Sequence, residues 1–321
     1  MNVNEISRFR IQNLTSDNIS DVMALQLEYH HLYPQAEVIE GVVFLSPGYS
    51  MGENVICAVN TDGKLMGYVP VYCHLVDEPG TPHLVWANMV ISPGVVNSQS
   101  LRDLLFQNAI KRAREITDSV PSHPIRVMFQ YHVSEVESIK YVVSKGAVYS
   151  DSVLRMVCDL SGEIAVVPAP SNIEVRYWRM ETEAEQKAYV DARNEAFPHM
   201  PITVADWKYF LFSVVGDTGT TVGAFEADEV VGAVSAYWYE TENRLRGRVT
   251  GWTENVFVRP RWRGKGIVDC MISMALVYLK EHGIKEAQLD PGASNQRAVR
   301  VYERMGYSIT DESQQFALDL S

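Results

Sequence analysis

The sequence contains few cysteines and no long apolar run. Its cysteines are Cys57, Cys73, Cys158 and Cys270, and their spacing matches no metal-binding motif. No apolar stretch approaches the roughly 18–20 residues that a membrane-spanning helix needs. The segment from Met1 to Arg10 lacks the apolar core of a signal peptide. We therefore expect a cytoplasmic protein with reduced thiols, no metal and no membrane partner.

Positive charge is also scarce. The chain has 28 Lys and Arg residues against 40 Asp and Glu residues, which gives a net charge of −12. Such an acidic balance argues against nucleic acid as a partner. The content of 46% hydrophobic residues is that of an ordinary globular protein. The length of 321 residues predicts about two domains, and both a monomer and a homodimer fit these properties.

One short stretch departs from the acidic average. Its basic residues are Arg259, Arg261, Arg263 and Lys265, with Gly264 and Gly266 among them. An apolar, β-branched run precedes the stretch, and residues 267–280 follow it with the apolar spacing of a helix. Free N–H groups and the positive end of a helix dipole attract anions, and glycine lets the backbone approach a ligand closely. The pattern predicts a site for a multiply charged anion such as a pyrophosphate.

The order of expected strands and helices repeats. The first half predicts strands at 9–15, 54–59, 65–75, 84–91, 125–129 and 153–160, with helices at 16–31, 100–116 and 133–145. The second half predicts strands at 173–179, 221–226, 230–240, 248–258, 286–290 and 314–320, with helices at 182–196, 203–214, 267–280 and 295–305. A Pro-, Gly- and Ser-containing stretch, 161–172, reads as a linker. We predict one domain over 1–160 and another over 173–321.

A weak residue repeat accompanies the repeated order. Residues 146–160 align without gaps on 306–320, and residues 87–93 align on 254–260. Few positions are identical, so chance similarity is the alternative. The agreement in element order favours duplication of one domain.

Two motifs in the second half resemble a known family. The first is Val258-x-Pro260-x-x-Arg263-Gly264-Lys265-Gly266-Ile267, and the second is Asn295-x-x-Ala298-x-x-Val301-Tyr302-x-x-x-Gly306-Tyr307. Together they resemble the acyl-CoA site of the GCN5-related N-acetyltransferase (GNAT) superfamily. The resemblance implies an α/β (α+β) fold of two tandem GNAT-like domains, each a mixed, mostly antiparallel twisted sheet flanked by helices. The arrangement is similar to that of mycothiol synthases, with a degenerate first domain.

The resemblance also implies acetyl-CoA as co-substrate, without a metal. The expected binding residues are Val256, Phe257, Val258, Arg261, Trp262, Arg263, Gly264, Lys265, Gly266, Ile267, Asn295 and Ala298. A solvated turn between strand and helix is the alternative for the basic loop. Asn295 is also expected to cap the following helix.

Glu254 and Tyr302 are the candidate catalytic residues. Strand alternation places residues 254, 256 and 258 on one face. The resemblance implies that this strand lies beside the thioester, which makes Glu254 the candidate base. The alternatives for Glu254 are an exposed carboxylate or an ion pair with Arg246 or Arg248. The resemblance implies that Tyr302 acts as the acid near the CoA sulfur, and a packed aromatic is its alternative.

The aligned positions of the first half lack these groups. Ala87 stands opposite Glu254, Val142 stands opposite Tyr302, and residues 94–99 stand opposite the basic loop without its cations or glycine pair. We therefore predict a single site, in the second domain.

The remaining expectation concerns the acceptor. We expect transfer of an acetyl group to a primary amine of a small molecule by direct attack in a ternary complex. The resemblance places residues 197–201 beside the acceptor. Acetylation of a protein N-terminus or lysine, and a non-catalytic acyl-CoA-binding regulator, are the alternatives.

Overall fold

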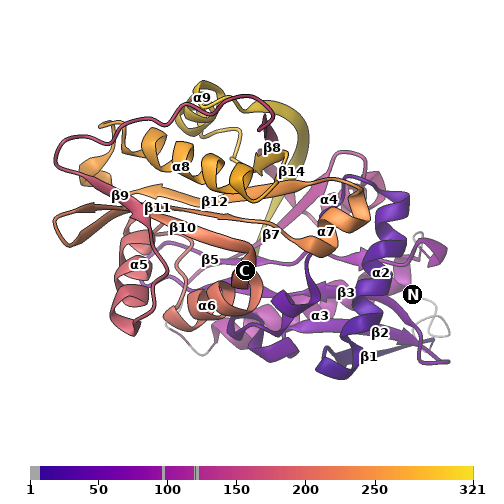
Figure 1. Cartoon of the computed structure of the whole chain (residues 1–321). Helices are drawn as coiled ribbons and strands as arrows, with labels where there is room; N and C mark the ends of the chain where they lie inside the picture. The colour runs from indigo at the N-terminus through magenta and orange to yellow at the C-terminus, as the bar shows by residue number, and fades with distance from the viewer. Residues whose placement is uncertain (1–7, 96–97, 119, 121–122, 321) are drawn as a thin grey trace. The chain divides into compact units, whose positions relative to one another are not determined.

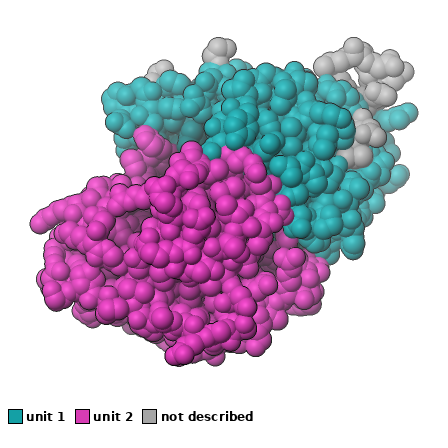
Figure 2. All heavy atoms as spheres, turned by 90° about the horizontal axis from the view of Figure 1, so that it is seen from above, with its two compact units in different colours: residues 1–151, 313–321 teal, residues 152–312 magenta. Residues whose placement is uncertain are grey.

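The structure is a computed structural model that describes residues 8–95, 98–118, 120 and 123–320. The chain divides into two compact units, shown in separate colours in Figure 2. Unit 1 comprises residues 1–151 and 313–321, and unit 2 comprises residues 152–312. Each unit combines sheets with helices, which confirms the predicted α/β class (Figure 1).

Unit 1 contains two groups of strands. The first is the antiparallel order β1-β2-β3-β6, and the second is β4-β5-β7-β14, in which only β5 and β7 are parallel. The strands are β1 (Phe9–Asn13), β2 (Val55–Asn60), β3 (Leu65–Pro70), β4 (Tyr72–His74), β5 (His83–Trp86), β6 (Val90–Ile91), β7 (Ile125–His132) and β14 (Ser308–Leu320). The helices are α2 (Ile19–Leu32), α3 (Gln99–Thr117) and α4 (Val136–Ser144), with 3-10 turns at Ser16–Asn18, Gly41–Leu45, Pro47–Gly52 and Pro93–Val95. Helix α3 buries Leu101, Leu105 and Ala109 in the main core of the unit, on the face that its spacing predicts.

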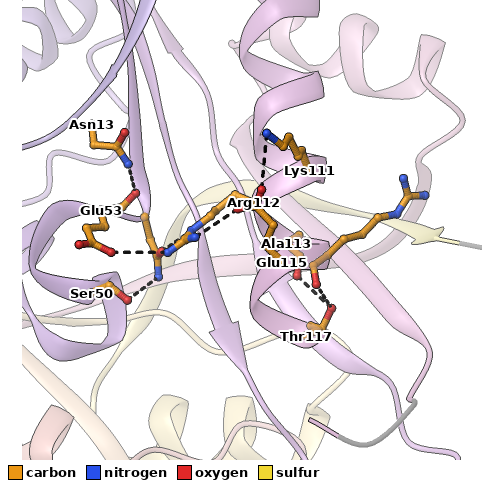
Figure 3. A network of polar contacts seen from close by, with 10 residues as sticks. Asn13, Ser50, Glu53, Lys111, Arg112, Ala113, Glu115 and Thr117 are labelled. Atoms are coloured by element: carbon orange, nitrogen blue, oxygen red, sulfur yellow. Dashed lines mark hydrogen bonds and ion pairs between the residues drawn. The ribbon is translucent and has the colours of Figure 1, made fainter. Parts of the chain in front are cut away.

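Basic side chains on the outer part of α3 form ion pairs and hydrogen bonds with other residues of unit 1. The Arg112 Nε donates to the Asn54 Oδ1 at 2.8 Å, and the Arg112 Nη1 pairs with Glu115 at 3.2 Å (Figure 3). Glu53 lies 3.8 Å from the Arg112 Nη2, and Lys111 pairs with Glu115 at 3.6 Å. These cations are therefore largely compensated by neighbouring carboxylates.

Unit 2 is built on one sheet with helices on both faces. Its strand order is β8-β13-β12-β11-β10-β9, antiparallel except between β12 and β13. The strands are β8 (Val148–Asp159), β9 (Glu174–Tyr177), β10 (Gly219–Glu226), β11 (Glu229–Tyr237), β12 (Thr250–Val258) and β13 (Glu286–Leu289). The helices are α5 (Glu183–Ala196), α6 (Val204–Tyr209), α7 (Glu240–Arg246), α8 (Ile267–Glu281) and α9 (Gln296–Arg304), with a π-helical turn at Phe210–Val215 and 3-10 turns at Gly216–Thr218 and Pro260–Trp262. Helix α8 covers one face of the sheet, and α5 covers the other (Figure 1).

The last strand of each half joins the unit formed by the other half. Residues 313–320 of β14 pair with β7 in unit 1, whereas β8 pairs with β13 in unit 2. The boundaries between the units therefore fall inside β8 and β14. Our division at residue 160, with a second domain from residue 173, stays a prediction drawn from the sequence repeat.

The repeated order of elements is present in the structure. Strand β1, helix α2, strands β2 and β3, helix α3, strand β7 and helix α4 correspond in order to β9, α5, β10, β11, α8, β13 and α9. Gly146 and Gly306, which the repeat aligns, share a left-handed conformation with φ of 93° and 92°. Residues 161–172 form neither helix nor strand, as predicted, and the Val167 N–H donates to the Ser273 hydroxyl of α8 at 3.0 Å. Helix α7 was not predicted, because its seven residues carry no apolar period.

Candidate active site

A cleft opens in unit 2 where β12 extends beyond its parallel neighbour. The two strands pair only over Thr250–Trp252 and Glu286–Gln288, and β12 then continues to Val258. The cleft has a volume of about 670 Å³. Its lining comes from the end of β12, the loop before α8, the first turn of α8, helix α9 and the end of α5. The two sequence motifs thus meet in one cavity.

A β-bulge at Asn255 corrects the expected direction of Glu254. The register runs from Ala233 opposite Phe257 to Ser235 opposite Glu254, so β12 carries one extra residue there. Asn255 adopts a φ of 49°, in the left-handed region. Our expectation that residues 254, 256 and 258 share a face was wrong, because the bulge breaks the alternation.

Core contacts show the two faces of β12 directly. Val256 and Val258 pack against the core under α8, whereas Phe257 belongs to the core under α5. Glu254 faces the second side, where the Tyr237 hydroxyl donates to its Oε2 at 2.6 Å. Among the described residues that line the cleft, Val256, Phe257 and Val258 are present and Glu254 is not.

The open edge of β12 presents backbone N–H groups. The Arg259 N–H donates to the Val231 carbonyl of β11 at 2.8 Å. Successive N–H groups of a strand point to opposite edges, so the Val258 N–H points away from β11, and the Val256 N–H, two residues earlier, does the same. Beyond Trp252 this edge no longer pairs with β13. A ligand extended along the cleft could therefore accept hydrogen bonds from this edge.

The glycines of the basic loop adopt a left-handed backbone conformation, which glycine tolerates. Gly264 and Gly266 have φ of 82° and 79°, and Gly266 is the N-cap of α8. Both line the cleft together with Ile267, whose side chain is buried. Because the first N–H groups of a helix have no partner within the helix, the start of α8 supplies donors to the cleft.

The basic residues of the loop do not act as one group. Arg263 lines the cleft, and its guanidinium donates to the carbonyls of Val258 and Ala196 at 3.0 and 3.3 Å. Arg259 forms ion pairs with Glu195 and Glu229, each at 2.6 Å, so its charge is compensated outside the cleft.

The remaining loop side chains surround Trp262. The Arg261 guanidinium lies over the Trp262 ring at 4.9 Å, and the Trp262 indole donates to the Glu226 Oε2 at 3.0 Å. Trp262 lines the cleft, whereas Arg261 and Lys265 are not among the described lining residues. Binding by Arg261 and Lys265 therefore stays a prediction.

Helix α9 forms the opposite wall of the cleft. Asn295 caps the helix by accepting from the Ala298 N–H at 3.2 Å, as predicted, and both residues line the cleft. Our sequence reasoning missed three further lining residues of this helix, Arg297, Arg300 and Arg304. Their spacing of three and four residues, on a helix that begins at a motif asparagine, was the signal that could have identified them.

Glu254 occupies a polar cluster within an aromatic environment. Burial raises the pKa of Glu254 above the ordinary value, and the hydrogen bond from Tyr237 acts in the opposite direction. The Tyr237 ring packs edge-on against Phe210 at 5.4 Å. Arg246, one of the two alternative ion-pair partners, pairs with Glu242 at 3.1 Å.

Tyr302 lies in the wall of the cleft on α9. It is 9% exposed, and burial raises the pKa of its hydroxyl to about 12. The hydroxyl is therefore protonated at neutral pH. Its ring centroid lies 6.0 Å from that of Tyr307, so Tyr302 combines packing with access to the cavity.

The corresponding part of unit 1 is organised differently. Asp103, in the first turns of α3, accepts from the Tyr141 hydroxyl of α4 at 2.9 Å and pairs with Lys145 at 2.6 Å. The Arg102 guanidinium lies 5.6 Å from the Tyr141 ring centroid and is buried. The aligned stretch 94–99 includes residues 96 and 97, which lie outside the described residues. Our expectation that unit 1 carries no acyl-CoA site stays a prediction drawn from the sequence.

The glycine loop, the open strand edge and the buried tyrosine all lie within a segment that matches a family of acetyltransferases. Residues 177–307 match the model of the acetyltransferase (GNAT) family. A mycothiol acetyltransferase of Actinosynnema mirum is 25% identical over 319 residues, covering 91% of this chain and 95% of the relative. A mycothiol acetyltransferase of Renibacterium salmoninarum is 24% identical over 164 residues, and this match spans 49% of the chain and only 47% of that relative.

A solved structure shares the fold of nearly the whole chain. A tandem GNAT protein from the clavulanic acid biosynthesis pathway matches with a TM-score of 0.69 at 12% identity, covering 97% of this chain and 98% of that protein. The chain is thus an acyltransferase with a tandem GNAT arrangement, as the repeated elements indicated.

Two further observations concern the described residues only. No helix within residues 8–95, 98–118 and 123–320 is long and apolar enough to cross a membrane. The same part of the chain contains no group of three or more His, Cys, Asp or Glu side chains that could hold a metal ion. The four cysteines are free, and three of them are buried.

Proposed function

We propose that the protein transfers an acetyl group from acetyl-CoA to a primary amine of a small molecule, by direct attack within a ternary complex. The observation that supports this most is the convergence of the glycine loop, the open edge of β12 and Tyr302 on one cleft. Acetyl-CoA would place its pyrophosphate at the start of α8 and its thioester near Val256. The two relatives named above are mycothiol acetyltransferases, which favours a small-molecule acceptor.

The chemistry assigns one role to each candidate residue. The amine nitrogen attacks the thioester carbonyl carbon, and Glu254 accepts the proton that the amine loses. The Val256 N–H stabilises the negative charge on the carbonyl oxygen. As the C–S bond breaks, Tyr302 donates its proton to the departing sulfur, which yields free CoA and the acetylated amine. Glu254 acts from the Tyr237 side of β12, where the acceptor would enter.

Release of the CoA thiol tests the reaction. We expect acetyl-CoA to be consumed with stoichiometric thiol release when a panel of small primary amines is supplied, and mass spectrometry should find one added acetyl group on the amine. A set of peptides with free N-termini or lysines serves as the comparison. If only peptides were acetylated, the acceptor would be a protein N-terminus or lysine and not a small molecule. If acetyl-CoA bound but no acetyl group were transferred, the protein would be an acyl-CoA-binding protein and not an enzyme.

The loop backbone gives an independent test. We expect Gly266→Ala to weaken acetyl-CoA binding about tenfold, because a Cβ would stand where the backbone approaches the phosphates, and its φ of 79° is strained for alanine. Calorimetry measures the affinity.

Gly283→Ala is the matched control for this substitution. Gly283 has a φ of 82° and, like Gly266, open space at its Cβ position, but it follows the other end of α8. Both variants should lose about 1–2 kcal/mol of unfolding free energy. Equal acetyl-CoA affinities in the two variants would contradict the assignment of the loop.

A further inference from the structure

Three arginines form one face of α9 in the wall of the cleft. Arg297, Arg300 and Arg304 are separated by three and four residues, which places them on the same side of the helix. All three are exposed, so they remain accessible to a ligand. We call these three residues the α9 arginine face.

The α9 arginine face reaches the loop and the start of α8. A Cβ placed on Gly264 would lie 3.6 Å from the Arg297 Nη2, so this guanidinium lies against the glycine loop. At the other end, the Arg304 Nη2 bonds to the Asp269 Oδ1 in the first turn of α8 at 2.6 Å. Arg300 lies between these two along the helix.

The cleft lining carries more positive charge than binding of a pyrophosphate requires. Among the described lining residues, four arginines (the α9 arginine face and Arg263) stand against one carboxylate, that of Asp269. Within this lining, three positive charges therefore have no carboxylate to match them, although the chain has a net charge of −12. The cations around Arg112 in unit 1, by contrast, are matched by carboxylates (Figure 3).

A ligand with a second anionic group would match this excess. Arg263 and the start of α8 suffice for two phosphodiester-type charges, whereas a phosphate monoester adds about 1.5 to 2 negative charges near pH 7. Such a monoester is present on the ribose of coenzyme A. Guanidinium groups bind phosphate oxygens in bidentate fashion, which favours arginine at such a subsite.

We propose that Arg297 and Arg300 bind the 3′-phosphate of coenzyme A, so that the cleft distinguishes acyl carriers with this monoester from carriers that end at the pyrophosphate. The proposal rests on the proposed function. Arg304 is partly neutralised by Asp269 and contributes less. Binding of the monoester is then separable from binding of the pyrophosphate by Arg263.

Calorimetric titration of CoA and 3′-dephospho-CoA tests this subsite. We expect the unsubstituted protein to bind CoA about tenfold more tightly than 3′-dephospho-CoA. The double variant Arg297→Ala/Arg300→Ala should bind both ligands alike, with its affinity for 3′-dephospho-CoA within about twofold of the original. Arg176→Ala, which removes an exposed arginine on β9 away from the cleft, should retain the full preference.

The possible failures point to different assignments. Equal affinity of the unsubstituted protein for both ligands would overturn the subsite, as would a double variant that loses affinity for both ligands equally. A clear CoA preference without acetyl transfer to any amine or peptide would support the subsite and overturn the proposed reaction. Acetyl transfer together with equal affinity for CoA and 3′-dephospho-CoA would support the proposed reaction and overturn the subsite.

Discussion

Glu254→Gln is expected to lower kcat by about 10²–10³-fold and to change acetyl-CoA affinity by less than about twofold. Glutamine retains the shape of the side chain and can accept the hydrogen bond from Tyr237, but it cannot take a proton from an amine. Glu254 does not line the cleft among the described residues, so the co-substrate should bind as before. Steady-state kinetics and calorimetry measure the two quantities.

Glu286→Gln is the matched control for this variant. Glu286 lies on the neighbouring strand β13 and accepts from the Thr250 hydroxyl at 3.3 Å, but it is not part of the cleft lining. Its substitution should leave kcat unchanged. Turnover of the Glu254 variant equal to that of this control would remove Glu254 from the mechanism.

The pH profile provides a second measure of the same residue. Burial raises the pKa of Glu254, the base works only when deprotonated, and activity should therefore decline as the pH falls through this raised pKa. The charged and titratable groups that act on the carboxylate are Tyr237 on β11, Tyr189 on α5, Glu242 on α7, Arg155 on β8 and Asp290 after β13.

Tyr237→Phe should move the acidic limb of kcat/KM to higher pH. The hydrogen bond from Tyr237 favours the carboxylate form of Glu254 and lowers its pKa, whereas burial raises it. Removal of the hydrogen bond should therefore raise the pKa of Glu254 further. A limb that stays in place, or moves to lower pH, would show that Tyr237 does not set the protonation of Glu254.

The loop and α8 could be predicted because their signals are local. A β-branched run, two glycines and an amphipathic helix follow one another within about 30 residues, and each signal refers to its own segment. The conformations of Gly264 and Gly266 follow from the same local requirement. The cap at Asn295 is equally local, since the side chain bonds three residues ahead.

The direction of Glu254 could not be read from the strand pattern. A single extra residue at Asn255 reverses which face each side chain takes, and no run of apolar residues marks it. Asn255 is held by a distant partner, because its Oδ1 accepts from the Arg193 Nε on α5 at 3.1 Å. Arg259 is similar, since its partners Glu195 and Glu229 lie far away in the sequence.

The exchange of strands β8 and β14 also depends on contacts between segments that are far apart in the sequence. Both strands end a copy of the repeated order, and the edges that they can join, on β7 and β13, are topologically equivalent. Sequence periodicity specifies that a strand forms and which face it buries, but the choice between two equivalent edges depends on the connections of the whole chain. Local sequence patterns therefore could not predict which edge each strand joins.

Tyr302→Phe is expected to lower kcat by about 10²-fold with little change in acetyl-CoA affinity. The ring would remain packed near Tyr307, so the change removes only the hydroxyl that we assign to protonation of the sulfur. Because burial raises the pKa of Tyr302 to about 12, this acid stays protonated across the working range, and its own ionisation should not limit activity below about pH 10. Kinetics between pH 6 and about pH 10 measure both effects.

Tyr307→Phe provides the contrast that separates chemistry from packing. The Tyr307 hydroxyl forms a hydrogen bond of 2.7 Å with the Thr253 hydroxyl and is buried outside the cleft lining, so its loss should cost about 1 kcal/mol of unfolding free energy and leave kcat intact. The Tyr302 variant should show the opposite pattern, with turnover reduced and stability nearly unchanged. If both variants lose stability and retain turnover, Tyr302 is a packed aromatic, and the proton for the departing sulfur must come from elsewhere.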